Sequence, residues 1–123
     1  MSEKPGAGVT LFPNALLDHA MAGLSGAEFK VLAYIVRRSL GLGQEGAALS
    51  LARICAGVRT ADGAALDEGT GLAKKTAIVA LRGLERKGLI AVRRPARGGA
   101  PPTVSVRWRP GADDPPSRKQ EGG

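Results

Sequence analysis

Hydrophobic and polar residues follow a helical period between residues 69 and 90, GTGLAKKTAIVALRGLERKGLI. At about 100° per residue, Ala77, Leu81 and Leu84 fall on one side of such a helix. The opposite side, about 100° to 220° away from Leu81, holds Lys75, Thr76, Val79, Arg82, Gly83 and Arg86. The pattern predicts a helix that stops at Gly88, because glycine adopts the left-handed cap without strain.

The side of this helix that faces away from the apolar stripe carries three cations and no acid. Arginine and lysine can bind guanine edges or phosphates, threonine and valine can contact a thymine methyl group, and glycine allows a groove wall to come close. These are properties of a DNA recognition helix. A solvated amphipathic helix would show the same period, so the sequence on either side decides between the two interpretations.

Two short strands are predicted directly after this helix, over residues 89–94 and 103–109. The second alternates strictly, and the side chains on one of its faces are Val104, Val106 and Trp108. Between the strands, the sequence PARGGAPP is typical of a surface loop, with Arg97 at its tip. A two-stranded ribbon attached to a basic helix is the pattern of a winged helix. There the helix enters the major groove and the ribbon reaches a phosphate or the minor groove.

A capping box opens the clearest helix of the N-terminal half, because Ser25 is followed three residues later by Glu28. The apolar period continues to Leu40, and the central segment VLAYIV is apolar nearly all round. We therefore expect this helix to form the core. Arg37 and Arg38 lie in its last turn, where positive charge suits the helix dipole; contact with a DNA backbone is the alternative role.

A second helix is predicted from a cap at Ser50 to residue 56 or 57, after a short strand or extended segment over residues 48–51. The sequence that follows, VRTADGAALDEGTGL, is too long for the usual turn of a helix-turn-helix motif. Asp62 and Gly63 form a favourable hairpin turn between two short extended runs. We therefore predict a small hairpin inserted before the recognition helix, with Gly63 at positive φ.

Together these elements predict a small α+β winged helix-turn-helix domain with a two-stranded C-terminal wing and an inserted hairpin before the recognition helix. The domain spans residues 9–109, between a flexible tail over residues 1–8 and a disordered tail over residues 110–123. A chain of 123 residues forms one domain, and its 43% hydrophobic residues can bury one modest core.

Positive charge is concentrated in the C-terminal half. The formal charge is +7; residues 1–70 hold six Lys or Arg against seven Asp or Glu, and residues 71–123 hold twelve against four. A polyanion is therefore the expected partner of the C-terminal half. No run of 18 apolar residues and no apolar signal segment occur, so we expect no membrane contact and a cytoplasmic, nucleoid-associated protein.

Cys55 and His19 are the single cysteine and the single histidine of the chain. One of each excludes an intrachain disulfide, a zinc finger and a multi-histidine metal site. Cys55 stands among apolar residues, which favours a buried structural thiol over a reactive one. The sequence contains neither a dinucleotide-binding glycine motif nor a P-loop, and no nucleophile with a partner base is visible. We therefore expect a protein that is not an enzyme and uses no metal, cofactor or small-molecule ligand.

The segments LSLARICAG and RTADGAALDEGTGLAKKTAIVALRGLERKGLI resemble the N-terminal winged-helix domain of the phage replication protein O family. The resemblance covers roughly residues 9–109 and is most specific in the connection before the recognition helix. The matching positions are Phe12, Pro13, Asn14, Leu16 and Leu17, then Asp62, Gly63, Leu66, Asp67, Gly69, Thr70, Gly71 and Leu72, and finally Thr76, Leu81, Leu84, Glu85, Gly88, Leu89 and Ile90. Ala73 stands where the family has a serine cap, so we expect Thr70 to open the helix instead. The resemblance implies origin binding; the chain ends where the family's partner-binding region begins.

We expect sequence-specific binding of double-stranded DNA, as an origin or operator module of a mobile element that acts in DNA replication or transcription regulation. The alternative is a winged-helix interaction module in a larger nucleoprotein complex, which grips DNA mainly by its backbone and contacts a protein partner or forms a homodimer. A single-strand or RNA binder is a third class, disfavoured because the few aromatic residues fit core positions. The expected DNA-binding residues are Lys74, Lys75, Thr76, Val79, Arg82 and Arg86 on the recognition helix, and Arg93, Arg94, Arg97 and Arg107 on the wing.

Overall fold

Helix α1 (Gly26–Arg38) forms the core of the computed structural model, which describes residues 8–96 and 98–107. It begins with the predicted capping box. The Ser25 hydroxyl accepts a hydrogen bond from the Glu28 amide (3.0 Å), and the Glu28 carboxylate accepts one from the Ser25 amide (2.9 Å). The fully enclosed side chains of α1 are Val31, Leu32, Ile35 and Val36. The expectation that this apolar helix lies at the centre of the core is confirmed.

α1 ends before Leu40, where the hydrophobic period had placed its end. The buried Ser39 hydroxyl and the Ser39 amide both donate to the Ile35 carbonyl (2.6 and 3.0 Å), and Ser39 leaves the helical conformation at φ −121° and ψ −83°. The chain then tightens into a 3-10 turn, η3 (Leu40–Leu42), which Gly43 terminates at φ 76°. The helix therefore ends at Arg38, before the apolar pattern does.

The segment before α1 covers one end of the core. It contains a π-helical turn, η1 (Leu16–Ala20), and a 3-10 turn, η2 (Met21–Gly23). Leu16 is buried, and the Phe12 ring contacts the Phe29 ring with centroids 5.9 Å apart. This segment therefore adds apolar cover to α1 without adding a strand to the sheet.

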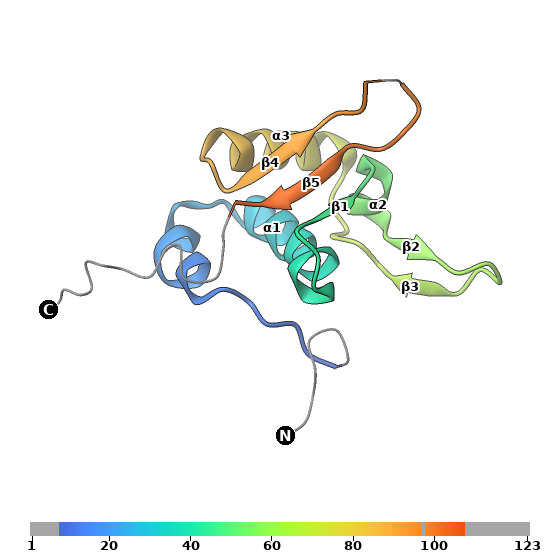
Figure 1. Cartoon of the computed structure of the whole chain (residues 1–123), viewed down its shortest axis with the longest axis horizontal. Helices are drawn as coiled ribbons and strands as arrows, with labels where there is room; N and C mark the ends of the chain where they lie inside the picture. The colour runs from blue at the N-terminus through green and yellow to red at the C-terminus, as the bar shows by residue number, and fades with distance from the viewer. Residues whose placement is uncertain (1–7, 97, 108–123) are drawn as a thin grey trace, which may run out of the picture.

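The C-terminal ribbon belongs to a three-stranded antiparallel sheet with the strand order β1-β5-β4 (Figure 1). β4 (Ile90–Arg93) and β5 (Thr103–Val106) are the two predicted strands, each shorter than expected. β1 (Gly46–Ala48) pairs with the other edge of β5. The expected two-stranded wing is thus extended by a third strand, because the pairing partner of β5 lies far upstream in the chain.

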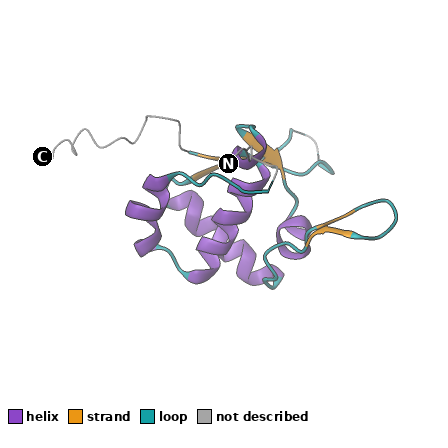
Figure 2. Cartoon of the chain, turned by 90° about the horizontal axis from the view of Figure 1, so that it is seen from below, coloured by secondary structure: helices purple, strands orange, loops and turns teal. Residues whose placement is uncertain are grey.

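The inward face of this sheet completes the core. Val104 and Val106 of β5 are buried, as is Ile90 of β4, so the predicted alternation of β5 is confirmed over the described residues. Figure 2 shows the helices grouped on one side of the sheet. Trp108 and Arg109, which the sequence placed in the same strand, lie outside the described residues.

Helix α2 (Leu51–Ala56) begins at the predicted cap, where the Ser50 hydroxyl accepts a hydrogen bond from the Arg53 amide (3.1 Å). β2 (Val58–Arg59) and β3 (Ala65–Asp67) then form the predicted inserted hairpin, with Gly63 at φ 90°. Figures 1 and 2 both show this hairpin projecting from the body of the protein. The hairpin and its turn are therefore confirmed.

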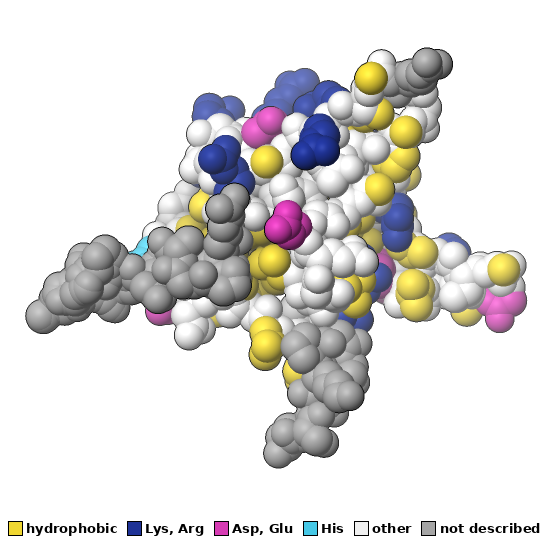
Figure 3. All heavy atoms as spheres, viewed as in Figure 1, with side chains coloured by type: hydrophobic (Ala, Val, Ile, Leu, Met, Phe, Trp, Pro, Cys, Tyr) yellow, Lys and Arg dark blue, Asp and Glu magenta, His cyan; other side chains and the backbone are white. Residues whose placement is uncertain are grey.

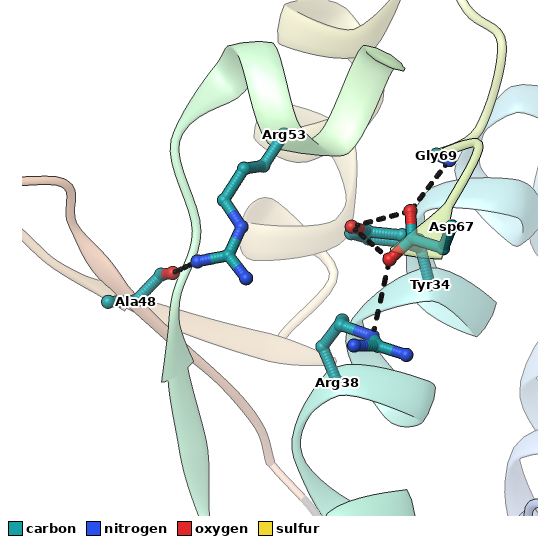
Figure 4. Close-up of polar contacts among 6 residues, drawn as sticks. All are labelled: Tyr34, Arg38, Ala48, Arg53, Asp67 and Gly69. Carbon is teal, nitrogen blue, oxygen red and sulfur yellow. Dashed lines mark hydrogen bonds and ion pairs between the residues drawn. The ribbon is translucent and has the colours of Figure 1, made fainter. Parts of the chain in front are cut away.

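Asp67 fastens the base of this hairpin to α1 (Figure 4). The Tyr34 hydroxyl lies 3.1 Å from both carboxylate oxygens of Asp67, and the Gly69 amide donates to Oδ1 at 2.8 Å. Arg38 Nε lies 3.6 Å from Oδ2. Burial, reinforced by the Asp67 charge, raises the pKa of Tyr34 above its ordinary value, so the phenol stays a donor. Arg38 lies in the last turn of α1, as expected for a charge that suits the helix dipole, and it also makes an ion pair that the sequence did not predict.

Helix α3 (Lys74–Arg86) is the predicted recognition helix, and Gly88 follows it at φ 79° as expected. Its N-cap residue, Ala73, provides no side-chain hydrogen bond. The Thr70 hydroxyl instead accepts from the Leu72 amide (3.2 Å) and donates to the Ile54 carbonyl (2.9 Å). The expectation that Thr70 opens α3 is therefore wrong, because its hydroxyl binds the end of α2.

The described residues form a small α+β domain, as predicted. Apart from Gly8, the two tails predicted at the chain ends lie outside these residues. Cys55 packs against the core and is partly buried, so the expectation of a buried residue is met only in part. None of the helices in the described ranges combines the length and the apolar character that crossing a membrane requires.

Candidate nucleic-acid interface

α3 presents the predicted recognition residues to solvent. All six of them are exposed, namely Lys74, Lys75, Thr76, Val79, Arg82 and Arg86. Val79 is 63% exposed although it is apolar. At helical spacing, Lys75, Val79, Arg82 and Arg86 lie on one stripe along α3. Figure 3 shows Lys and Arg side chains gathered along the upper edge of the protein, over α3.

The buried stripe of α3 is rotated by about 60° around the helix axis from the predicted one. The buried positions are Ala77, Ala80, Gly83 and Leu84. Leu81, one of the three residues of the predicted apolar face, is only partly buried. Gly83 lies on the inner side, so its predicted place on the outward face is wrong. The exposed Glu85 lies about 60° from Arg82, so the expectation of a face without acids is also wrong.

A polar contact between α1 and α3 explains this rotation. A Cβ atom on Gly83 would overlap Oε2 of Glu28, so the missing side chain makes room for a buried carboxylate. Oε1 of Glu28 accepts a hydrogen bond from Lys87 Nζ at 2.7 Å, and the same Nζ donates to the Gly23 carbonyl at 2.9 Å. Gly83 thus serves the packing of two helices rather than the approach of a DNA groove.

A groove of about 360 Å³ lies beside the exposed face, between α3 and the start of α1. Its lining residues are Ser25, Ala27, Glu28, Lys75, Thr76, Val79 and Ala80. The hydrogen bond from Lys87, and after it the one from the Ser25 amide, lowers the pKa of Glu28 below its ordinary value. The sequence did not predict this groove, because it forms where two helices distant in the chain meet.

Other basic side chains are used within the fold. They are Lys30, Arg38, Arg53 and Lys87, which contact Thr70, Asp67, Ala48 and Glu28 respectively. In the part of the chain that the structure describes, the ion pairs are Arg38 with Asp67 and Lys87 with Glu28. The cations left without an acidic partner on α3, within those residues, are Lys74, Lys75, Arg82 and Arg86. The fold thus separates structural cations from those on the surface of α3.

The wing adds further exposed cations. Arg93 ends β4 opposite Thr103 of β5, and Arg94 and Arg107 are likewise exposed. Arg97, predicted at the wing tip, lies outside the described residues. In the view of Figure 1 the loop between β4 and β5 extends past one end of α3 along the same edge. The wing therefore adds exposed cations to those of α3.

Side chains of the metal-binding types do not gather anywhere in residues 8–96 and 98–107: no three His, Cys, Asp or Glu there could hold an ion together. Comparisons with models of known protein families, with curated proteins and with solved structures found no match for the chain. The candidate interface therefore rests on the exposure, charge and arrangement of its own residues.

Proposed function

We propose that the chain is a winged helix-turn-helix module that binds double-stranded DNA sequence-specifically, with α3 in the major groove and the β4–β5 wing on the backbone. The observation that carries the proposal is that α3 exposes a row of cations together with Val79, and no acid within the described residues pairs with them. A helix of 13 residues is about 20 Å long at 1.5 Å per residue. Such a helix fits the major groove, which is about 12 Å wide.

Base reading is supported by the mixture of side chains on this face. Arg82 can donate to guanine, and Val79 can contact a thymine methyl group. Glu85 can accept a hydrogen bond from cytosine, but it repels phosphate. A surface that gripped only the backbone would gain nothing from this acid. The mixed face therefore favours sequence-specific binding over the alternative of a backbone grip within a larger complex.

The resemblance to phage replication protein O extends the proposal to an origin or operator of a mobile element as the target. Three matching residues of the connection, Asp67, Gly69 and Thr70, make the contacts that fix the hairpin base. These contacts give the matching residues a structural role at the hairpin base of this chain. Initiation and repression are both compatible with such a module.

The proposal is tested by selecting bound duplexes from a random pool with the whole chain. Affinities for the selected duplex and a scrambled one are then measured over a salt series. Arg82→Ala should cost about 1 to 3 kcal/mol on the selected duplex and much less on the scrambled one. Arg93→Ala should weaken both alike and lower the slope of log affinity against log salt by about one.

Arg59→Ala is the matched control, since Arg59 is an exposed arginine on β2 and lies outside both proposed contact surfaces. It should leave the preference for the selected duplex unchanged. Equal losses on both duplexes for Arg82→Ala would move the proposal to the backbone-gripping alternative. Failure to enrich any duplex, with no salt-dependent binding of random DNA, contradicts DNA binding itself.

A further inference from the structure

The β2–β3 hairpin is an ordered structure that packs nothing at its outer end. We call residues 58–68 the arm. Residues 59–66 are all exposed. The Thr60 amide nevertheless donates a hydrogen bond to the Ala64 carbonyl (2.8 Å), and the Gly63 amide donates one to the Thr60 carbonyl (2.9 Å). The Ala64 amide also donates to Asp62 at 3.2 Å. The arm therefore keeps its shape through its own hydrogen bonds rather than through the core.

The base of the arm is held in a fixed direction. The Thr70 amide bonds the Ile54 carbonyl at 2.8 Å, and the Gly71 amide bonds the Cys55 carbonyl at 2.9 Å. These hydrogen bonds join the segment after β3 to the end of α2, and Asp67 joins it to α1 (Figure 4). A rigid base under an exposed hairpin is the arrangement of a projecting contact element.

A β-bulge turns one large apolar side chain of the arm outward. Val58 pairs with Asp67 and Arg59 pairs with Ala65, so Leu66 has no partner in the register. Bulges re-aim side chains and interrupt an edge that another strand could join. Leu66 is 59% exposed. The contact that the arm offers is therefore the Leu66 side chain, not its backbone edge.

The charge of the arm is opposite to that of the chain. The arm holds one arginine against three acids, whereas the whole chain carries +7. Of these acids, Asp62 and Glu68 are exposed on either side of Leu66 in the sequence. An acidic and apolar arm fits a partner surface that is basic around an apolar centre.

α1 carries a surface of this kind. A groove of about 340 Å³ is lined by Phe29, Lys30, Ala33, Tyr34, Gly69 and Thr70. The four heavy atoms of a leucine side chain occupy roughly 120 Å³ if each takes the volume of a water molecule, so the groove can hold one. Lys30 is exposed at its side, where its ammonium group donates to the Thr70 carbonyl at 3.2 Å and keeps its charge without an acidic partner among the described residues. Arg37 follows on the same helix face two turns later. The arm of the same chain projects from the body of the protein (Figures 1 and 2).

We propose that the chain forms a symmetric dimer in which Leu66 of each copy enters the Phe29–Ala33 groove of the other, with Glu68 facing Lys30. Gly69 and Thr70 line the groove and also form the base of the arm, so groove and arm adjoin. Two copies related by a twofold axis can therefore make both contacts at once and close the assembly. Binding of DNA plays no part in this association.

Sedimentation of the whole chain without DNA, over a range of concentrations, tests the dimer. The unchanged chain should show a reversible monomer–dimer equilibrium. Leu66→Asp should raise the dissociation constant about tenfold or more, because an apolar contact is replaced by a carboxylate. Glu68→Lys and Lys30→Glu should each raise it, and the two together in one chain should restore it to within about threefold.

Leu11→Asp and Glu45→Lys are matched controls, since both residues are exposed and lie outside the arm and the groove. They should leave the equilibrium unchanged, and circular dichroism checks that each variant folds. A chain that stays monomeric throughout, a dimer that tolerates Leu66→Asp, or a double charge reversal that restores nothing overturns the proposal. Because no DNA is present, each of these results leaves the proposed function standing.

Discussion

Two carboxylates hold two different elements to α1. Near its start, Glu28 accepts hydrogen bonds from Lys87 (2.7 Å) and the Ser25 amide (2.9 Å) and joins α1 to α3. Further along, Asp67 lies 3.1 Å from the Tyr34 hydroxyl and 3.6 Å from Arg38 and joins α1 to the arm. Glu28 joins two helices that also pack through buried apolar side chains. Asp67 lies at the base of the arm, whose outer end has no buried side chains.

This difference decides what each carboxylate contributes. α3 also buries Ala77, Ala80 and Leu84 in the shared core, so Glu28 mainly sets how α3 is rotated. The arm has no comparable apolar anchor, so polar and backbone contacts at its base carry most of its attachment. The surface proposed to read DNA is therefore set by packing, and the surface proposed to bind a second copy is set by hydrogen bonds.

The largest expected effect is at the base of the arm. Gly57 has φ 87° and ψ −162°, a conformation essentially restricted to glycine, and an added Cβ would overlap the Asp67 carbonyl oxygen. Gly57→Ala should lower the unfolding free energy by about 2 to 4 kcal/mol. The loss cannot exceed the free energy that holds the arm to the rest of the protein, because the arm would then detach. Urea denaturation measures the loss, and amide hydrogen exchange should rise in the arm before it rises in α1.

Gly63→Ala is the control, because Gly63 has φ 90° but nothing within 4 Å of the added Cβ. It should show only the cost of positive φ, about 1 to 2 kcal/mol. If both alanine variants cost the same, the overlap with Asp67 contributes nothing, and the base of the arm is softer than its contacts indicate.

Gly83→Ala tests the other carboxylate and should have a smaller effect. Helix propensity alone predicts stabilisation of about 1 kcal/mol for alanine at this position. The added methyl group would displace the Glu28 carboxylate from its hydrogen bonds, so we expect a net loss of about 1 to 2 kcal/mol. Thermal and urea unfolding give the sign, with Gly26→Ala as an unobstructed control. Net stabilisation by Gly83→Ala would show that Glu28 moves aside freely.

The features predicted correctly from the sequence are those carried by neighbouring residues. Ser25 and Glu28 stand three positions apart, and Asp62 and Gly63 are adjacent, so their cap and turn need no distant partner. A short strand or extended segment was predicted over residues 48–51, whereas β1 lies at Gly46–Ala48. Its pairing with β5 was not predicted, because the sequence GAA becomes a strand only through that pairing.

The rotation of α3 was missed for the same reason. Glu28 and Lys87 are 59 residues apart in the chain, and a period counted along α3 contains no information about their contact. All the predicted cations of α3 are exposed nevertheless. Long charged side chains avoid burial, so they face solvent whether the apolar face is the predicted one or the observed one. Their exposure was thus predictable, whereas the position of Gly83 was not.

The smallest expected effect is a change in pH dependence at the Glu28 contact. The hydrogen bond from Lys87, followed by that from the Ser25 amide, lowers the pKa of Glu28 below its ordinary value of 4.5. The folded state therefore binds a proton less readily than the unfolded state. This stabilisation is complete above pH 4.5 and is lost as the pH falls through the lowered pKa of the folded protein.

Lys87→Met removes the largest cause of the lowered pKa while keeping an apolar stem of similar length. The pKa of Glu28 should return toward its ordinary value, so this variant should lose less stability than the unchanged chain when the pH falls below 4.5. Urea unfolding between neutral pH and pH 3 compares the two chains, and Glu28→Gln defines the response without the carboxylate. Parallel pH profiles for all three chains would mean that Lys87 does not hold Glu28 ionised. The rotation of α3 would then depend on apolar packing alone.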